Sequence, residues 1–114
     1  MKHSHVHFSV RDLAEAVRWF ESVWALSPSF ENAKMAMIPL GEFSFILDAA
    51  EADSRATIAF TSDDCERDFR RVKERGAEVI APPARTHWGV IAAYLKGPGE
   101  LTIEIEQPLA EADR

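Results

Sequence analysis

Residues 5–10 read His-Val-His-Phe-Ser-Val, and residues 57–62 read Thr-Ile-Ala-Phe-Thr-Ser. Polar or small side chains alternate with apolar ones in both segments, which is typical of a strand that packs one face against a core. A helical pattern follows each segment, beginning at Asp12 in the first case and at Asp64 in the second. The chain therefore contains two copies of a strand-then-helix unit at an offset of 52 residues, from position 5 to position 57. At the first polar position of the two copies, His5 is matched by Thr57.

The first helical pattern has a start signal and an apolar stripe. Asp12 and Glu15 have the spacing of a capping box, in which a side chain accepts hydrogen bonds from the first turn. Apolar residues then recur on one helical face, namely Leu13, Ala16, Val17, Phe20 and Trp24. We expect this helix to end near Ala25, because Ser27-Pro28 follows.

Short strand-like runs separated by turn residues complete each unit. In the first repeat unit, residues 3–48, we expect strands at 3–10, 29–32, 35–40 and 43–48. In the second, residues 55–107, we expect strands at 55–61, 78–81, 90–96 and 101–106, a helix ended by Gly76, and turns at Pro82-Pro83 and at 97–99. The sequence therefore predicts an α+β fold built from two βαβββ units.

The composition favours one small domain with a small-molecule partner. A chain of 114 residues, 46% hydrophobic, is long enough for one core and too short for two independent domains, so we predict a single domain over residues 1–114. The formal net charge is -6 and basic residues form no run, which argues against nucleic acid or an anionic membrane as a partner.

Cysteine usage and the first residues indicate the compartment. Cys65 is the one cysteine and lies on the apolar face of the second helical pattern, so an intramolecular disulfide is excluded and a reducing compartment is expected. Residues 1–10 contain no continuous apolar stretch such as a signal peptide or a membrane span requires. We therefore predict a cytoplasmic protein with no membrane role.

The order and spacing of three motifs resemble the vicinal-oxygen-chelate superfamily, which contains glyoxalase I, bleomycin resistance proteins and extradiol dioxygenases. The motifs are His5-Val-His-Phe-Ser-Val-Arg-Asp-Leu13 before a helix, Thr57-Ile-Ala-Phe60, and Trp88-Gly89 through Gly97-Pro-Gly-Glu-Leu-Thr-Ile-Glu104. The resemblance covers nearly the whole chain. It implies that two βαβββ units pair so that their mixed sheets curl into a cup, with the helices on the outer face and metal ligands on the inner strands. It also implies a homodimer, because relatives commonly pair.

Only part of the family's metal site carries over to this sequence. The resemblance places His5 on the first-strand metal ligand and Glu104 on the last-strand carboxylate ligand. Thr57 stands where some members present a second histidine, and Ile46 stands where a glyoxalase I presents a glutamate. A catalytic divalent metal ion is typically held by about three protein ligands, so two are usually too few.

Three hypotheses for the function follow. The first is a small-molecule binding protein similar to the drug-sequestering branch of the family, with a small organic ligand in the cup and no obligate metal cofactor. The second is a metal-dependent lyase, transferase or dioxygenase, in which His5 and Glu104 bind a divalent metal and a third ligand comes from a partner chain or from one of His7, Asp48 and Glu106. The third is an interaction module whose sheet edges pair with another chain.

The first hypothesis names a set of ligand-binding residues. Aromatic residues in the loop before a cup strand can form a wall or lid, and polar side chains on inner strands can anchor the ligand. We predict contacts from His5, His7, Thr57, His87, Trp88, Tyr94 and Glu104. We also expect His5 and Glu104 to form a pair if Glu104 points into a dry cup, because a buried carboxylate needs a partner.

Overall fold

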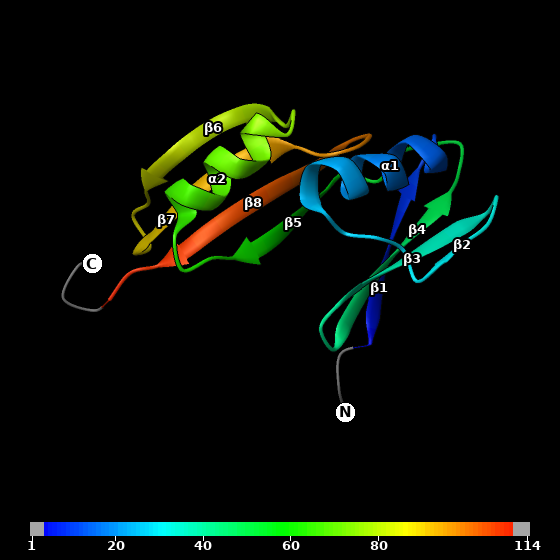
Figure 1. Ribbon diagram of the computed structural model, residues 1–114, viewed down its shortest axis with the longest axis horizontal. Helices are drawn as coiled ribbons and strands as arrows, with labels where there is room; N and C mark the ends of the chain where they lie inside the picture. Colours follow the sequence, from blue (N-terminus) through cyan, green and yellow to red (C-terminus); the bar gives the residue numbers. More distant parts are fainter. Residues whose placement is uncertain (1–3, 111–114) are drawn as a thin grey trace. The chain divides into compact units, whose positions relative to one another are not determined.

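The computed structural model describes residues 4–110 and divides the chain into two compact units (Figure 1). Unit 1 is Met1–Ala56 with Pro98–Glu100, and unit 2 is Thr57–Gly97 with Leu101–Arg114. The elements of unit 1 are β1 (His5–Val10), α1 (Leu13–Trp24), β2 (Phe30–Glu31), β3 (Met35–Leu40) and β4 (Phe43–Ala49). They are followed by β5 (Ala56–Thr61), α2 (Cys65–Glu74), β6 (Glu78–Arg85), β7 (Val90–Lys96) and β8 (Leu101–Pro108).

The two sheets repeat one strand order, β1-β4-β3-β2 and β5-β8-β7-β6. In the first sheet β1 runs parallel to β4, while β3 runs antiparallel to both β4 and β2. One helix follows the first strand of each set (Figure 1). The predicted α+β class and the βαβββ order are confirmed. The first predicted strand begins at His3, which lies outside the described residues.

Helix α1 starts and stops as the sequence signals require. The Asp12 carboxylate accepts a hydrogen bond from the backbone N–H of Glu15 at 3.0 Å, and Ala25 ends the helix in the left-handed conformation at φ 57°. The buried face contains Leu13, Ala16, Val17, Phe20 and Val23. Trp24, the last residue of the predicted stripe, is not among the fully buried residues. It is half-buried and stacks on Trp19, with ring centroids 6.2 Å apart.

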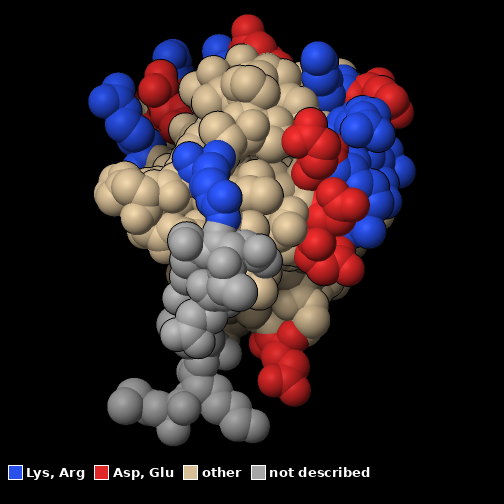
Figure 2. Space-filling view, turned by 90° about the vertical axis from the view of Figure 1, so that its left-hand side faces the viewer, with Lys and Arg blue, Asp and Glu red and all other residues tan. Residues whose placement is uncertain are grey.

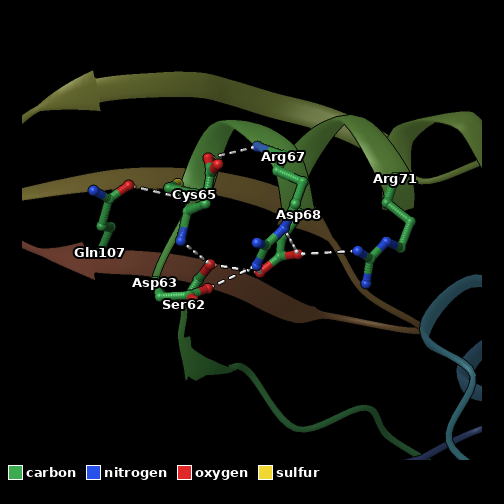
Figure 3. A network of polar contacts seen from close by, with 8 residues as sticks. Ser62, Asp63, Cys65, Arg67, Asp68, Arg71 and Gln107 are labelled. Carbon is green, nitrogen blue, oxygen red and sulfur yellow. Dashed lines mark hydrogen bonds and ion pairs between the residues drawn. The ribbon is translucent and has the colours of Figure 1, made fainter.

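Helix α2 is fastened at its first turn by a polar network (Figure 3). Asp68 accepts a hydrogen bond from the Ser62 hydroxyl and forms an ion pair with Arg67. The guanidinium of Arg67 also lies 2.7 Å from Oδ1 of Asp63. These contacts lower the pKa of Asp68 below its usual range, the bond from Arg67 being the main cause. At the other end Gly76, at φ 104°, donates its N–H to the Lys73 carbonyl and supplies the predicted stop.

Cys65 behaves as a small core residue. Its side chain is buried, and its thiol donates to the Ile105 carbonyl at 3.4 Å. Burial raises the pKa of the thiol to about 11, with nearby carboxylates adding to the effect. A thiol that stays protonated is a poor nucleophile, so catalysis through Cys65 is not expected.

The prediction of a turn at Pro82-Pro83 is wrong, because both prolines lie within β6. Strand β6 is the outermost strand of its sheet, and an outer strand leaves one row of N–H groups unpaired, so proline is tolerated there. The pairing with β7 shifts register between Ala81 and Ala84, where the two prolines lie. The strand therefore continues to Arg85, beyond the predicted end at Ala81.

Some charged side chains on the surface lie beside partners of opposite sign. Figure 2 shows acidic and basic residues next to one another toward the sides of the face it presents, and a basic side chain within the uncharged area between them. Arg67 with Asp63, and Arg71 with Asp68 at 3.7 Å, are examples on α2. Within residues 4–110, neither helix is long and apolar enough to cross a membrane.

Candidate functional site

The sheet of unit 1 has one face covered by α1 and one face directed away from it. The rings of Phe20 on α1 and Phe45 on β4 lie 4.9 Å apart, which fixes the covered face. Val6 is the register partner of Phe45, so Val6, Phe8 and Val10 share the covered face. His5, His7 and Ser9 therefore project from the opposite face, which we call the face away from α1.

Four register partners form one row across all four strands of this face. His7 on β1 pairs with Ile46 on β4, Ile46 pairs with Met37 on β3, and Met37 pairs with Phe30 on β2. Ile46 is 4% exposed, and Phe30 at the outer end is 50% exposed. We call Phe30, Met37 and Ile46 the apolar row. It ends at the imidazole of His7.

The imidazole of His7 is held by a carboxylate from a neighbouring strand. Its Nδ1 lies 2.6 Å from Oδ2 of Asp48 on β4, and the two side chains are 52% and 37% exposed. The ring of His5 lies edge-on to that of His7, with centroids 5.0 Å apart, and its Nδ1 is 2.8 Å from the Ser4 hydroxyl. We call the pair of His7 and Asp48 the His7–Asp48 dyad. It places a proton-carrying group directly beside the apolar row.

The sheet of unit 2 carries an acidic cluster on strands β7 and β8. Tyr94 is the register partner of Glu104, and Ala92 is the partner of Glu106, so the three polar side chains share one face. The Tyr94 hydroxyl donates a hydrogen bond to Glu104. Burial raises the pKa of Glu104, the neighbouring Glu106 raises it further, and the bond from Tyr94 opposes the shift. The pKa of Tyr94 is raised as well, by burial and then by Glu104.

The remaining predicted contacts lie on β5 and on the β6–β7 connection. Thr57 is exposed, in alternation with the half-buried Ile58. His87 and Trp88 lie in the turn before β7, with their rings edge-to-face at 4.9 Å, and Trp88 is 52% exposed. The structure thus joins Tyr94 to Glu104, His87 to Trp88, and His5 to His7. His5 and Glu104 belong to different units, and their pairing stays a prediction.

The comparisons with known proteins identify the family. A family model described as the glyoxalase/bleomycin resistance protein/dioxygenase superfamily matches residues 2–105. The chain belongs to this superfamily. A search of curated proteins gives no match.

Solved structures of the superfamily have the same fold at low sequence identity. A glyoxalase/bleomycin resistance protein/dioxygenase from Nocardioides is 18% identical with a TM-score of 0.84, over 97% of this chain and 85% of that one. A glyoxalase-related enzyme from Fulvimarina pelagi is 14% identical with a TM-score of 0.79, over 100% and 96%. A bleomycin resistance determinant encoded on the transposon Tn5 is 16% identical with a TM-score of 0.79, over 96% and 100%.

The residues at the superfamily's metal positions do not supply the usual donor set. Ile46 has no donor atom, and Thr57 offers only a hydroxyl. The carboxyl of Glu104 is engaged by Tyr94, and burial raises its pKa. Among residues 4–110, no group of three or more His, Cys, Asp and Glu side chains is arranged to hold a metal ion. Two of the four positions that the resemblance assigns to metal ligands therefore lack an imidazole or a carboxylate.

Sequence reasoning did not identify the apolar row on the face of the unit 1 sheet that is directed away from α1. It places Phe30 and Met37 on strands but assigns them no role, and it names Asp48 only as a substitute metal ligand. The two-residue alternation of β3 and β4 was a usable signal, because Met37, Ile46 and Asp48 fall on one face once the pairing is known.

Proposed function

We propose that the protein binds a small organic molecule with an apolar body, on the sheet faces directed away from the helices and without an obligate metal ion. The observation that supports this most strongly is the apolar row of Phe30, Met37 and Ile46, which ends at His7. A largely apolar surface with a few fixed polar groups is typical of a small-molecule site. Fold membership alone does not decide the function, so the proposal rests on these side chains.

Each sheet offers its own polar anchors for a ligand. His5 and His7 are the candidates on the sheet of unit 1. On the sheet of unit 2 the candidates are Thr57, Tyr94 and Glu104, with His87 and Trp88 in the turn before β7. The hydrogen bond between Tyr94 and Glu104 fixes one of these anchors before a ligand arrives. Anchors that are already ordered lose less conformational entropy on binding.

The binding test uses a library of aromatic and aliphatic fragments with ligand-observed NMR. We expect hits whose signals weaken when Phe30→Ser or Met37→Ser is introduced, because each change removes apolar contact area. Val6→Thr is the matched control, since it makes a similar polar change on the face covered by α1. Hits that bind all four proteins equally, or an absence of hits with the unsubstituted protein, would contradict the proposal.

The metal test separates this proposal from the metal-dependent alternative. The purified protein is analysed for metal content, and its melting temperature is measured with divalent zinc, nickel, manganese and iron. We expect substoichiometric metal and no rise in melting temperature that depends on His5. A stoichiometric metal, or a stabilisation lost in His5→Ala, would instead favour a lyase, transferase or dioxygenase with His5 and Glu104 as ligands.

We also propose that the chain forms a homodimer. Each sheet has two outer strands, and an outer strand presents backbone N–H and C=O groups that another chain can pair with. Light scattering coupled to size exclusion measures the mass directly. A monomer at micromolar concentration would contradict this part of the proposal.

A further inference from the structure

The last turns of α2 carry an excess of positive charge in an otherwise acidic chain. Residues 70–75 contain four basic residues and one acidic residue, whereas the formal net charge of the whole chain is -6. The four basic residues are all exposed, and we call them the basic end of α2: Arg70, Arg71, Lys73 and Arg75. The overall composition does not account for this local excess, which belongs to one end of one helix.

The carboxylates of the unit neutralise this end only in part. Asp68 forms an ion pair with Arg67 in the first turns of the helix and lies 3.7 Å from Arg71 (Figure 3). Within residues 4–110, no ion pair joins a carboxylate to the other three basic residues of this end, Arg70, Lys73 and Arg75. Their charges are therefore available to a group from outside the chain.

The spacing of two arginines matches the spacing of side chains in an extended peptide. Arg71 and Arg75, the residue that ends the helix, are four positions apart. They therefore share one helix face and are separated by about 6 Å along the axis. In an extended segment every second side chain points to the same side, about 6.6 Å apart. Two carboxylates with one residue between them can thus face both guanidinium groups, and each guanidinium can donate two parallel hydrogen bonds to a carboxylate.

We propose that the basic end of α2 is a docking surface for a short, extended, carboxylate-rich segment of a partner protein. The charge complementarity between this end and such a segment carries the proposal. A long polyanion such as nucleic acid would also meet the acidic residues that dominate the rest of the chain, so a short acidic segment is favoured. Helix α2 is not part of the sheet faces proposed for the small organic ligand, and the inference does not depend on that function.

The probe is a blocked heptapeptide in which glutamate alternates with alanine, titrated into the full chain by calorimetry at low salt. We expect saturable binding that is lost at high salt, because exposed charges are screened. The double variant Arg71→Gln/Arg75→Gln should bind roughly 5-fold more weakly, since each exposed ion pair changes an affinity by a few-fold. Arg11→Gln/Arg55→Gln removes the same two charges from unit 1 and should stay within about twofold of the unsubstituted protein.

A second measurement separates docking from helix stabilisation. Basic residues in the last turn of a helix also interact favourably with the helix dipole, so the double variant can lose stability without any docking role. The heptapeptide is therefore added to the unsubstituted, nitrogen-15-labelled protein. We expect it to shift the backbone amide signals of residues 70–76 and to leave those of unit 1 in place. A lowered melting temperature in the double variant, with no shifted signals in the unsubstituted protein, would overturn the inference.

Three further outcomes would overturn it. The first is equal binding of a heptapeptide in which glutamine replaces glutamate, because the carboxylates would then be irrelevant. The second is an equal loss of binding in Arg11→Gln/Arg55→Gln, which would show that net charge alone matters. The third is a single-stranded oligonucleotide of equal charge that binds more tightly than the acidic peptide, which would assign the basic end to nucleic acid.

Discussion

Replacing Ile46 by glutamate tests whether the apolar row is a desolvated surface. Ile46 is 4% exposed and lies between His7 and Met37 in the register. Burial of an isoleucine side chain contributes about 1.5–3 kcal/mol, which the substitution removes. A buried carboxylate without a full set of partners costs roughly 1–3 kcal/mol more. We therefore expect Ile46→Glu to lower the free energy of unfolding by about 2.5–6 kcal/mol.

The assay is urea unfolding followed by circular dichroism, with Ile46→Val as the matched control. The valine variant keeps the site apolar and should lose only about 0.5–1.5 kcal/mol. The comparison is made with and without divalent zinc, because a glutamate at this position restores a donor atom. If Ile46→Glu lowered the free energy of unfolding by less than about 1 kcal/mol, the glutamate carboxylate would be in contact with water at this position. The argument that the apolar row is desolvated would then be wrong.

Three further predictions concern charge and backbone. Because the pKa of Glu104 is raised in the folded state, that state binds more protons than the unfolded chain, and stability falls as pH rises through the interval between the ordinary and the raised pKa. Glu104→Gln should therefore be more stable than the unsubstituted protein at neutral pH, with the difference vanishing in acid; thermal melts across pH check this. The pKa of Asp68 is lowered, mainly by Arg67, so its contribution is present at neutral pH and lost as pH falls through the lowered value. Asp68→Asn should lower the melting temperature at pH 7 and not in strong acid, and an equal effect at both would contradict the ion-pair argument. Gly99 has φ 62°, and a Cβ added there would lie 2.6 Å from the Asp53 carboxylate. Gly99→Ala should therefore lower the free energy of unfolding by roughly 1–3 kcal/mol, measured by urea unfolding. An unchanged free energy of unfolding would contradict the predicted clash.

Local sequence signals predicted most of the fold. The caps of both helices, the stop at Gly76 and the alternating strands depend on neighbouring residues, and each is read within a few positions. The extent of β6 depends instead on which strand lies at the edge of the sheet. Pro82-Pro83 predicts a turn by local rules, and only the strand order shows that an outer position accepts both prolines.

The candidate site could be predicted only in part, for the same reason. Alternation in β1 places His5 and His7 on one face without knowledge of other strands. The contact of His7 with Asp48 joins residues 41 positions apart, and it depends on the parallel register of β1 with β4. Sequence spacing does not encode that register, so the dyad became visible only with the sheet. The pairing of His5 with Glu104 stays a prediction.

The prolines of β6 also affect which edge of the unit 2 sheet can pair with a further strand. Two consecutive residues without N–H groups leave the outer edge of β6 unable to form a continuous ladder with another strand, which protects this edge from aggregation. At the opposite edge, β5 reads Ala-Thr-Ile-Ala-Phe-Thr and keeps every backbone donor. The two edges of this sheet therefore differ in their backbone donors: β5 has an N–H group at every residue, and β6 lacks two in succession.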